Sequence, residues 1–165
     1  MKNKWFSNKT TESTLQRYFF VAKAFLMVTP VLFYSYITVK ASMNGYNIQE
    51  LLNKEPQTTI LLVNSMLNAY AAYLLHLAQK NISGHNVFSA VINIGMLMLS
   101  QALARNAFGL LLLLFVFAKA TRYYNISLKS TLRKFTIKQF LFDGGGSLII
   151  VFLNALMLFA TIKLM

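Results

Sequence analysis

Apolar residues occur along this chain in long blocks, and polar or charged residues collect between the blocks. A helix needs about 20 mostly apolar residues to cross the roughly 30 Å hydrocarbon layer of a bilayer. Five blocks approach this length, and we expect each to form a transmembrane helix. They cover residues 18–39, 58–78, 87–104, 106–124 and 144–162. The pattern predicts an all-α, polytopic membrane helical bundle, with residues 1–165 forming a single integral membrane domain.

The third and fourth blocks are separated only by Arg105 and Asn106, so one long helix is the alternative to an antiparallel pair. The enrichment of Lys and Arg in cytoplasmic loops distinguishes the two layouts. With five spans and a cytoplasmic N-terminus, twelve of the 16 Lys and Arg residues lie inside and four outside. Fusing the two blocks would place more cations outside than inside. We therefore expect a turn at Arg105, a cytoplasmic N-terminus and an extracytoplasmic C-terminus in the cell membrane.

Composition agrees with this layout. The chain is 56% hydrophobic and 12% charged, whereas ordinary soluble domains are about 25% charged. Its net charge is +12, and the cations lie between apolar blocks, which favours anionic lipids over nucleic acid as their counterpart. The chain has no cysteine, so it has no disulfide framework and no thiolate chemistry.

The segment 125–143 between the last two blocks is basic and amphipathic. On a helical wheel, leucine and phenylalanine side chains share one face, and cations fill much of the other. These cations are Lys129, Arg133, Lys134 and Lys138. A helix of this kind is expected to lie along the inner headgroups, where it binds anionic lipid or docks a membrane-protein partner. The alternative is a basic loop that only sets the orientation of the spans.

A run of one acid and three glycines, Asp143 to Gly146, joins this segment to the last block. A phosphate-binding loop would need a Lys-Ser/Thr pair after the glycines, and none follows. We interpret Asp143 as a cap for the helix that follows. Gly144, Gly145 and Gly146 are interpreted as a hinge, or as a site of close backbone packing.

Polar residues within the blocks fall on helical stripes. An amide that faces lipid would leave its hydrogen bonds unmade, so these stripes are expected to face one another as an interhelical polar seam. Its predicted members are Asn64, Asn68, Asn93 and Asn154. The seam either holds helices together or binds a small substrate. In the loop 40–57, the stretch from Asn47 to Glu55 is either a short surface helix or a solvated connector.

No catalytic, metal-binding or cofactor-binding set can be assembled from the polar residues. His76 and His85 lack the H-E-x-x-H spacing of a zinc site. The sequence favours a non-enzymatic accessory, regulatory or immunity-type partner of a membrane complex, with a membrane-protein partner or a homo-oligomer expected. The first alternative is a small transporter or substrate-binding membrane subunit that uses the seam. The second is an intramembrane enzyme acting on a lipid-linked substrate through Asp143, His76 and His85.

Overall fold

The computed structural model describes residues 3–83, 87–124 and 137–164, with side chains placed for 13–82, 89–124 and 145–164. The described part consists of helices joined by short turns and contains no strand, which confirms the all-α prediction. Its helices are α1 Asn3–Met43, α2 Ile48–Lys54, α3 Pro56–Ser83, α4 Val87–Leu103, α5 Ala107–Tyr123 and α7 Ile137–Lys163.

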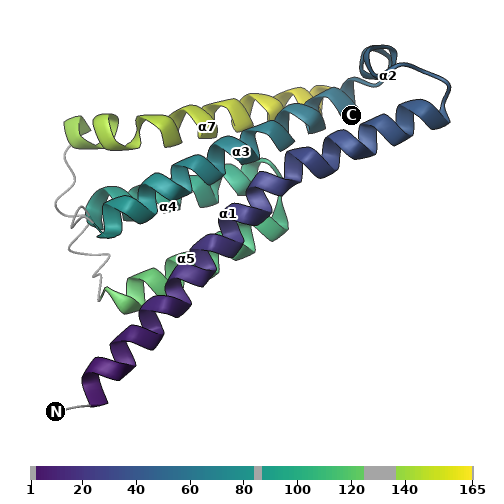
Figure 1. Ribbon diagram of the computed structural model, residues 1–165. Helices are drawn as coiled ribbons and strands as arrows, with labels where there is room; N and C mark the ends of the chain where they lie inside the picture. Colours follow the sequence, from purple (N-terminus) through teal and green to yellow (C-terminus); the bar gives the residue numbers. More distant parts are fainter. Residues whose placement is uncertain (1–2, 84–86, 125–136, 165) are drawn as a thin grey trace.

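Three long helices, α1, α3 and α7, run the length of the molecule, and a shorter α4–α5 hairpin packs along part of it (Figure 1). Helix α4 contacts α3, α5 and α7, whereas α5 contacts α1 and α4. The loop with α2 lies at one end of the bundle, and the N-terminus lies at the other (Figure 1). Helix α3 also contacts α1, α2 and α7, so α3 and α4 together form the centre of the fold.

The three long helices are also the ones that are long and apolar enough to cross a membrane. The qualifying stretches are Ser13–Met43, Pro56–Ile82 and Gly145–Lys163. Helices α4 and α5 have 17 residues each, which is about 25 Å of helix. Three described helices, fewer than the five predicted, therefore reach spanning length.

The predicted turn between the third and fourth blocks is confirmed. Helix α4 ends at Leu103 and α5 begins at Ala107. Arg105 lies between them in the left-handed region, with φ 55°. Its N–H donates to the carbonyl of Ala102 (3.1 Å), and the next N–H, that of Asn106, donates to Gln101 (3.0 Å). This pair of bonds is the Schellman motif that ends many helices.

Helix α1 ends in the same motif, with Gly45 in the left-handed position at φ 69°. Helix α2 then begins with a capping box. The side chain of Asn47 accepts from the N–H of Glu50 (2.9 Å), and the Glu50 carboxylate accepts from the N–H of Asn47 (3.2 Å). The structure thus selects the surface helix over the solvated connector for this stretch.

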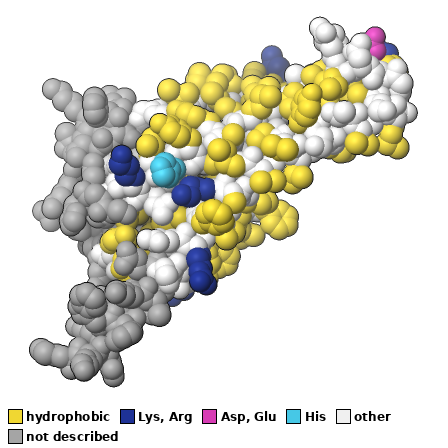
Figure 2. Space-filling view, viewed as in Figure 1, with side chains coloured by type: hydrophobic (Ala, Val, Ile, Leu, Met, Phe, Trp, Pro, Cys, Tyr) yellow, Lys and Arg dark blue, Asp and Glu magenta, His cyan; other side chains and the backbone are white. Residues whose placement is uncertain are grey.

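Apolar side chains form both the interior and the surface of the bundle. The larger buried cluster draws leucine, isoleucine, valine and alanine from α1, α3, α4, α5 and α7. Many large apolar side chains of α1 and α7 are nevertheless exposed, including Phe20, Leu32 and Phe152. Figure 2 shows apolar side chains spread over the visible face between the two ends, with basic side chains near both ends. An outward apolar surface of this kind is suited to lipid rather than water.

Candidate functional site

The polar seam is built around α4. Two hydrogen bonds join α4 to α7: Ser147 Oγ donates to Asn93 Oδ1 (2.7 Å), and Asn154 Nδ2 donates to Ser100 Oγ (2.6 Å). All four side chains are buried. Both pairs are separated by 54 residues in the sequence, so the two helices run parallel and repeat the same contact after seven residues.

A second group of bonds joins α4 to α3 and α5 through Gln101, whose side chain is fully buried. Gln101 Nε2 donates to Asn68 Oδ1 on α3 (3.0 Å). Gln101 Oε1 accepts from Asn106 Nδ2 (2.7 Å) in the turn, and Asn106 Oδ1 in turn accepts from the N–H of Gly109 (3.0 Å). The same network therefore caps α5 and fixes the hairpin to α3.

Glycine at position 109 is required by this network. A Cβ atom there would lie 2.3 Å from Gln101 Oε1 and 2.7 Å from Asn106 Nδ2. Sequence reasoning identified neither Gln101 nor Asn106 as members of the seam. Helical spacing gave no signal for either residue. At about 100° per residue, Gln101 lies about 80° around α4 from Asn93 and about 100° from Ser100, on a neighbouring face, and Asn106 lies in the turn after the helix.

The structure brings the four predicted seam residues onto the buried helix faces but does not join them to one another. Asn68 bonds to Gln101, Asn93 bonds to Ser147, and Asn154 bonds to Ser100. Within the described residues, Asn64 Oδ1 and Asn154 Oδ1 are buried and accept no hydrogen bond. Most polar groups of the seam thus form hydrogen bonds between helices, and two buried amide oxygens have no hydrogen-bond partner.

The predicted hinge lies within a helix. Helix α7 begins at Ile137 and continues without a break to Lys163, so Asp143 and Gly144 are interior positions. The prediction that a helix begins at the glycines is therefore wrong. Close packing does occur at Gly146, where a Cβ atom would lie 2.8 Å from Leu74 Cδ2 and 2.9 Å from Tyr70 Oη. At Gly145 no atom lies within 4 Å of that position.

The basic segment 125–143 lies mainly outside the described residues. This applies to Lys129, Arg133 and Lys134, and also to His85. Lys138 falls in the first turn of α7, and its side chain is not placed. On α3, His76 is exposed. Three residues further along the same helix, Gln79 accepts a hydrogen bond from Lys23 of α1 (2.8 Å), which joins the two helices near that end of the bundle.

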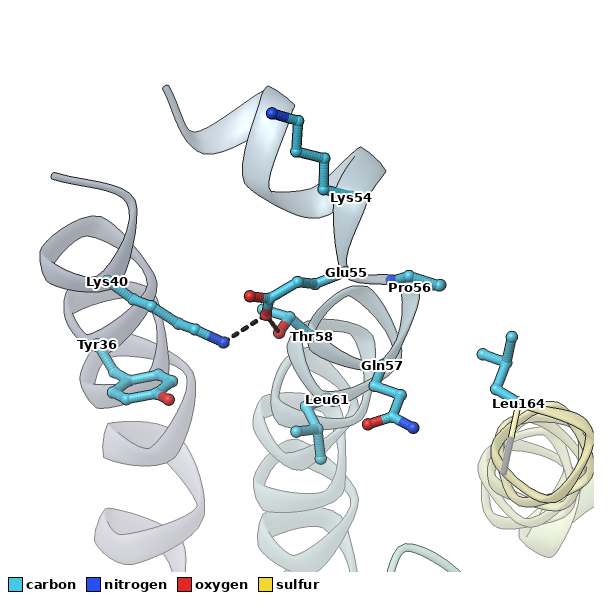
Figure 3. Close-up of a pocket in the computed structure, with 9 residues that line it drawn as sticks. All are labelled: Tyr36, Lys40, Lys54, Glu55, Pro56, Gln57, Thr58, Leu61 and Leu164. Carbon is cyan, nitrogen blue, oxygen red and sulfur yellow. Dashed lines mark hydrogen bonds and ion pairs between the residues drawn. The ribbon is translucent and has the colours of Figure 1, made fainter. Parts of the chain in front are cut away.

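An ionic group lies at the opposite end of the bundle (Figure 3). The Lys40 ammonium of α1 pairs with the Glu55 carboxylate just before α3, and Thr58 Oγ1 also donates to that carboxylate (2.6 Å). The hydrogen bond from Lys40 first, and that from Thr58 second, holds the pKa of Glu55 below its ordinary value of 4.5. This group fixes the start of α3 against the end of α1.

The same end carries an open cavity of about 570 Å³. Residues of α1, α2 and α3 and the residue just past α7 line it. Tyr36 and Lys40 come from α1, Lys54 from α2, Gln57 and Leu61 from α3, and Leu164 follows α7. In Figure 3 Lys40 points across toward Glu55, and Gln57 extends toward the side where Leu164 lies. The cavity thus combines charged, amide and apolar surfaces.

Comparison with protein-family models, with curated proteins and with solved structures finds no match to this chain. The geometry of its own residues therefore carries the functional argument.

Proposed function

We propose that the chain is a non-enzymatic multi-pass membrane protein that acts as an accessory, regulatory or immunity-type partner of a membrane complex. The observation that carries the proposal is the internal use of the seam. Its amide and hydroxyl groups bond one helix to the next, as in Gln101 to Asn68 and Ser147 to Asn93. Such bonds make a fixed bundle, each contributing about 0.6–2 kcal/mol. A fixed bundle suits a protein that acts through its outer surfaces.

The proposed layout has five membrane-inserted helices and a cytoplasmic N-terminus. Helices α1, α3 and α7 cross completely, and α4 and α5 enter together from the cytoplasmic side. The C-terminus then lies outside the cytoplasm. Because a hairpin leaves by the side from which it entered, three full crossings give the same sidedness as five. The segment 125–143 then lies at the inner leaflet, where each cation contributes about 1 kcal/mol toward anionic lipid.

The working surface in this proposal is the basic segment before α7. The test is co-purification of the tagged full-length chain from native membranes, followed by identification of the captured proteins. The test variant carries glutamate at Lys129, Arg133, Lys134 and Lys138. We expect it to lose the captured partner at least tenfold while its membrane insertion and abundance stay unchanged.

The control reverses cations at the other end of the bundle, Lys54 and Lys163. This control is expected to keep the partner. Equal capture by the wild type and the basic-segment variant would contradict the proposal. Equal loss in the variant and the control would also contradict it, because attraction by net charge would then suffice.

The second candidate is a small transporter or a substrate-binding subunit. The two buried amide oxygens without a partner, on Asn64 and Asn154, favour it, since buried polar groups are normally paired. Its test compares Asn64→Leu with Asn68→Leu. If the seam only holds helices together, Asn64→Leu should leave the free energy of unfolding unchanged or higher, because it removes an unpaired oxygen.

In the same comparison, Asn68→Leu should lower stability by about 1–3 kcal/mol, because it leaves Gln101 without its partner. Unfolding in detergent with increasing denaturant measures both variants. A loss of cellular function in Asn64→Leu without loss of stability would favour the transporter.

A further inference from the structure

The cavity at the α2 end exists because the α4–α5 hairpin is short. Gln101 of α4 bonds to Asn68 of α3, which places the two residues at the same height in the bundle. Beyond this height α4 continues for two residues to Leu103, whereas α3 extends twelve residues to Pro56. At 1.5 Å per residue, α3 rises about 18 Å above the shared height. Figure 1 shows the hairpin ending well short of α2.

The cavity lies on the face of α3 that the hairpin covers lower down. Leu61 and Gln57 precede Asn68 by seven and eleven residues, and these spacings keep all three on one face of a helix. Below, that face is sealed by the bond from Asn68 to Gln101. Above, Leu61 and Gln57 line the open cavity. The cavity therefore opens on this face of α3 above the end of the hairpin, where no helix separates the face from lipid.

The lining has two chemical halves. Tyr36, Leu61 and Leu164 supply apolar surface, and the side chains of Tyr36 and Leu61 are about half exposed, at 54% and 51%. The rim carries two cations and one acid, which leaves an excess of one positive charge. The acid, Glu55, is already paired with Lys40.

The second cation of the rim, Lys54, is paired with no carboxylate among the described residues. Its ammonium lies 3.7 Å from the centre of the Tyr46 ring. A cation–π contact at an exposed site is worth only about 0.5–1 kcal/mol, so an anion competes with it readily. Gln57, which also lines the cavity, adds amide donors. In Figure 3 the Lys54 ammonium points away from Gln57, so this exposed side chain has to turn toward the cavity to share a ligand with it.

We propose that this cavity is a binding site for one anionic phospholipid. The phosphodiester lies at the rim, near Lys54 and the amide of Gln57, and one acyl chain lies over Tyr36 and Leu61. The position at the ends of α1, α3 and α7 matches the depth at which a headgroup meets the hydrocarbon. The volume lies within the range of small-molecule sites, about 300–1,000 Å³. This inference does not depend on the proposed partner at the basic segment.

Native mass spectrometry of the full-length protein, purified in a neutral detergent, tests the site. The probes are phosphatidylglycerol, phosphatidylcholine with the same acyl chains, and glycerol phosphate without a chain. We expect one phosphatidylglycerol to bind at least tenfold more tightly than phosphatidylcholine, and glycerol phosphate to leave it in place. Displacement by glycerol phosphate would overturn the proposal, because it would identify a site for free phosphate.

Three variants separate this site from the general attraction of a +12 chain for anionic lipid. Leu61→Trp fills the apolar half and should reduce the number of tightly bound phosphatidylglycerol molecules by one. Lys54→Gln should weaken that molecule's binding roughly fivefold. The matched control is Lys163→Gln. Lys163 is a cation at the same end of the bundle but does not line the cavity, so this variant should change neither the number of bound phosphatidylglycerol molecules nor their affinity.

Equal weakening by Lys54→Gln and Lys163→Gln would overturn the proposal in favour of diffuse attraction. An unchanged lipid count in a folded Leu61→Trp would also overturn it. If Leu61→Trp fails to fold, Gln57→Glu takes its place, because this exposed position tolerates the change and the new carboxylate repels the phosphodiester. Wild-type affinity in Gln57→Glu would likewise overturn the proposal.

Discussion

Arg105 and Gly45 hold the same position in two helix-ending motifs, and this shared geometry makes them a matched pair. Both residues adopt a positive φ, 55° for Arg105 and 69° for Gly45. Glycine adopts this conformation freely, whereas other L-residues lose roughly 1–2 kcal/mol in it. The hairpin turn is therefore strained at Arg105, and the turn after α1 is relaxed.

Replacing Arg105 by glycine should stabilise the protein. The free energy gained by relieving the backbone strain exceeds the free energy lost because glycine gives the unfolded chain more entropy. The free energy of unfolding should therefore rise by about 0.5–1 kcal/mol. Gly45→Ala should lower stability by a similar amount, since no atom within 4 Å hinders its Cβ and only the backbone opposes it. Denaturant unfolding in detergent measures both. A destabilised Arg105→Gly would mean that the side chain makes a contact that outweighs the strain.

The lowered pKa of Glu55 predicts that the stability of the protein depends on pH. Its pKa is lower in the folded protein than its ordinary 4.5, because Lys40 and Thr58 donate hydrogen bonds to the charged form. A lowered folded pKa gives stability that is complete above 4.5 and is lost as the pH falls through the folded pKa. We expect the wild type to have a higher Tm than Glu55→Gln at pH 7, and the two to converge below pH 4.5. A difference that persists in acid would contradict this assignment.

Among the helices, α7 shows how neighbouring glycines differ in their surroundings. Gly146 faces Leu74 and Tyr70 of α3 at distances that leave no room for a Cβ, whereas Gly145 faces open space. Both lie in one continuous helix. Gly146 therefore allows the close approach of α7 to α3, whereas Gly145 does not contribute to it, and the two positions should respond to alanine in opposite directions.

Gly145→Ala should raise the free energy of unfolding by up to about 1 kcal/mol, because alanine favours the helix. Gly146→Ala should lower it by about 1–3 kcal/mol, because Tyr70 and Leu74 must move to admit the methyl group. Helix content and denaturant unfolding in detergent measure the outcome. Equal loss of function in both variants, with stability unchanged, would support a hinge instead.

For the molecule as a whole, the length of the α4–α5 hairpin determines how much of the bundle interior is enclosed by helices. Below the bond from Gln101 to Asn68, five helices surround a common apolar cluster. Above that height α1, α3 and α7 continue, and the cavity opens among them. The two ends of the molecule therefore differ in packing as well as in charge.

The proposed layout predicts the accessibility of single cysteines, and the chain offers a clean background because it has none of its own. In intact cells, a membrane-impermeant thiol reagent should label Asn44→Cys rapidly and leave Arg122→Cys unlabelled. Arg105→Cys should react more slowly than Asn44→Cys, because α4 ends about 15 Å below the start of α3. Labelling of Arg122→Cys from outside would reverse the layout and contradict it.

The helical class, the membrane-facing composition and the turn at Arg105 were all predictable from the sequence. Apolar blocks and cation placement are local or additive properties, so they can be counted along the chain. The stripe positions of Asn68, Asn93 and Asn154 were predictable for the same reason, because helical periodicity fixes which face a residue occupies. The basic amphipathic helix expected in the segment 125–143 stays a prediction, because residues 125–136 lie outside the described part of the chain.

Tertiary packing decided which residue pairs with which. Asn68 bonds to Gln101 rather than to another asparagine, because the height of α4 against α3 depends on all the helix contacts together. The same height leaves the hairpin short of the α2 end and opens the cavity beside Leu61. Helix α7 also runs without a break through the glycines, where the sequence predicted that a helix would begin. Periodicity gives the face of each helix, but the relative height of two helices is set only when their side chains pack, and the pairs and the cavity follow from that height.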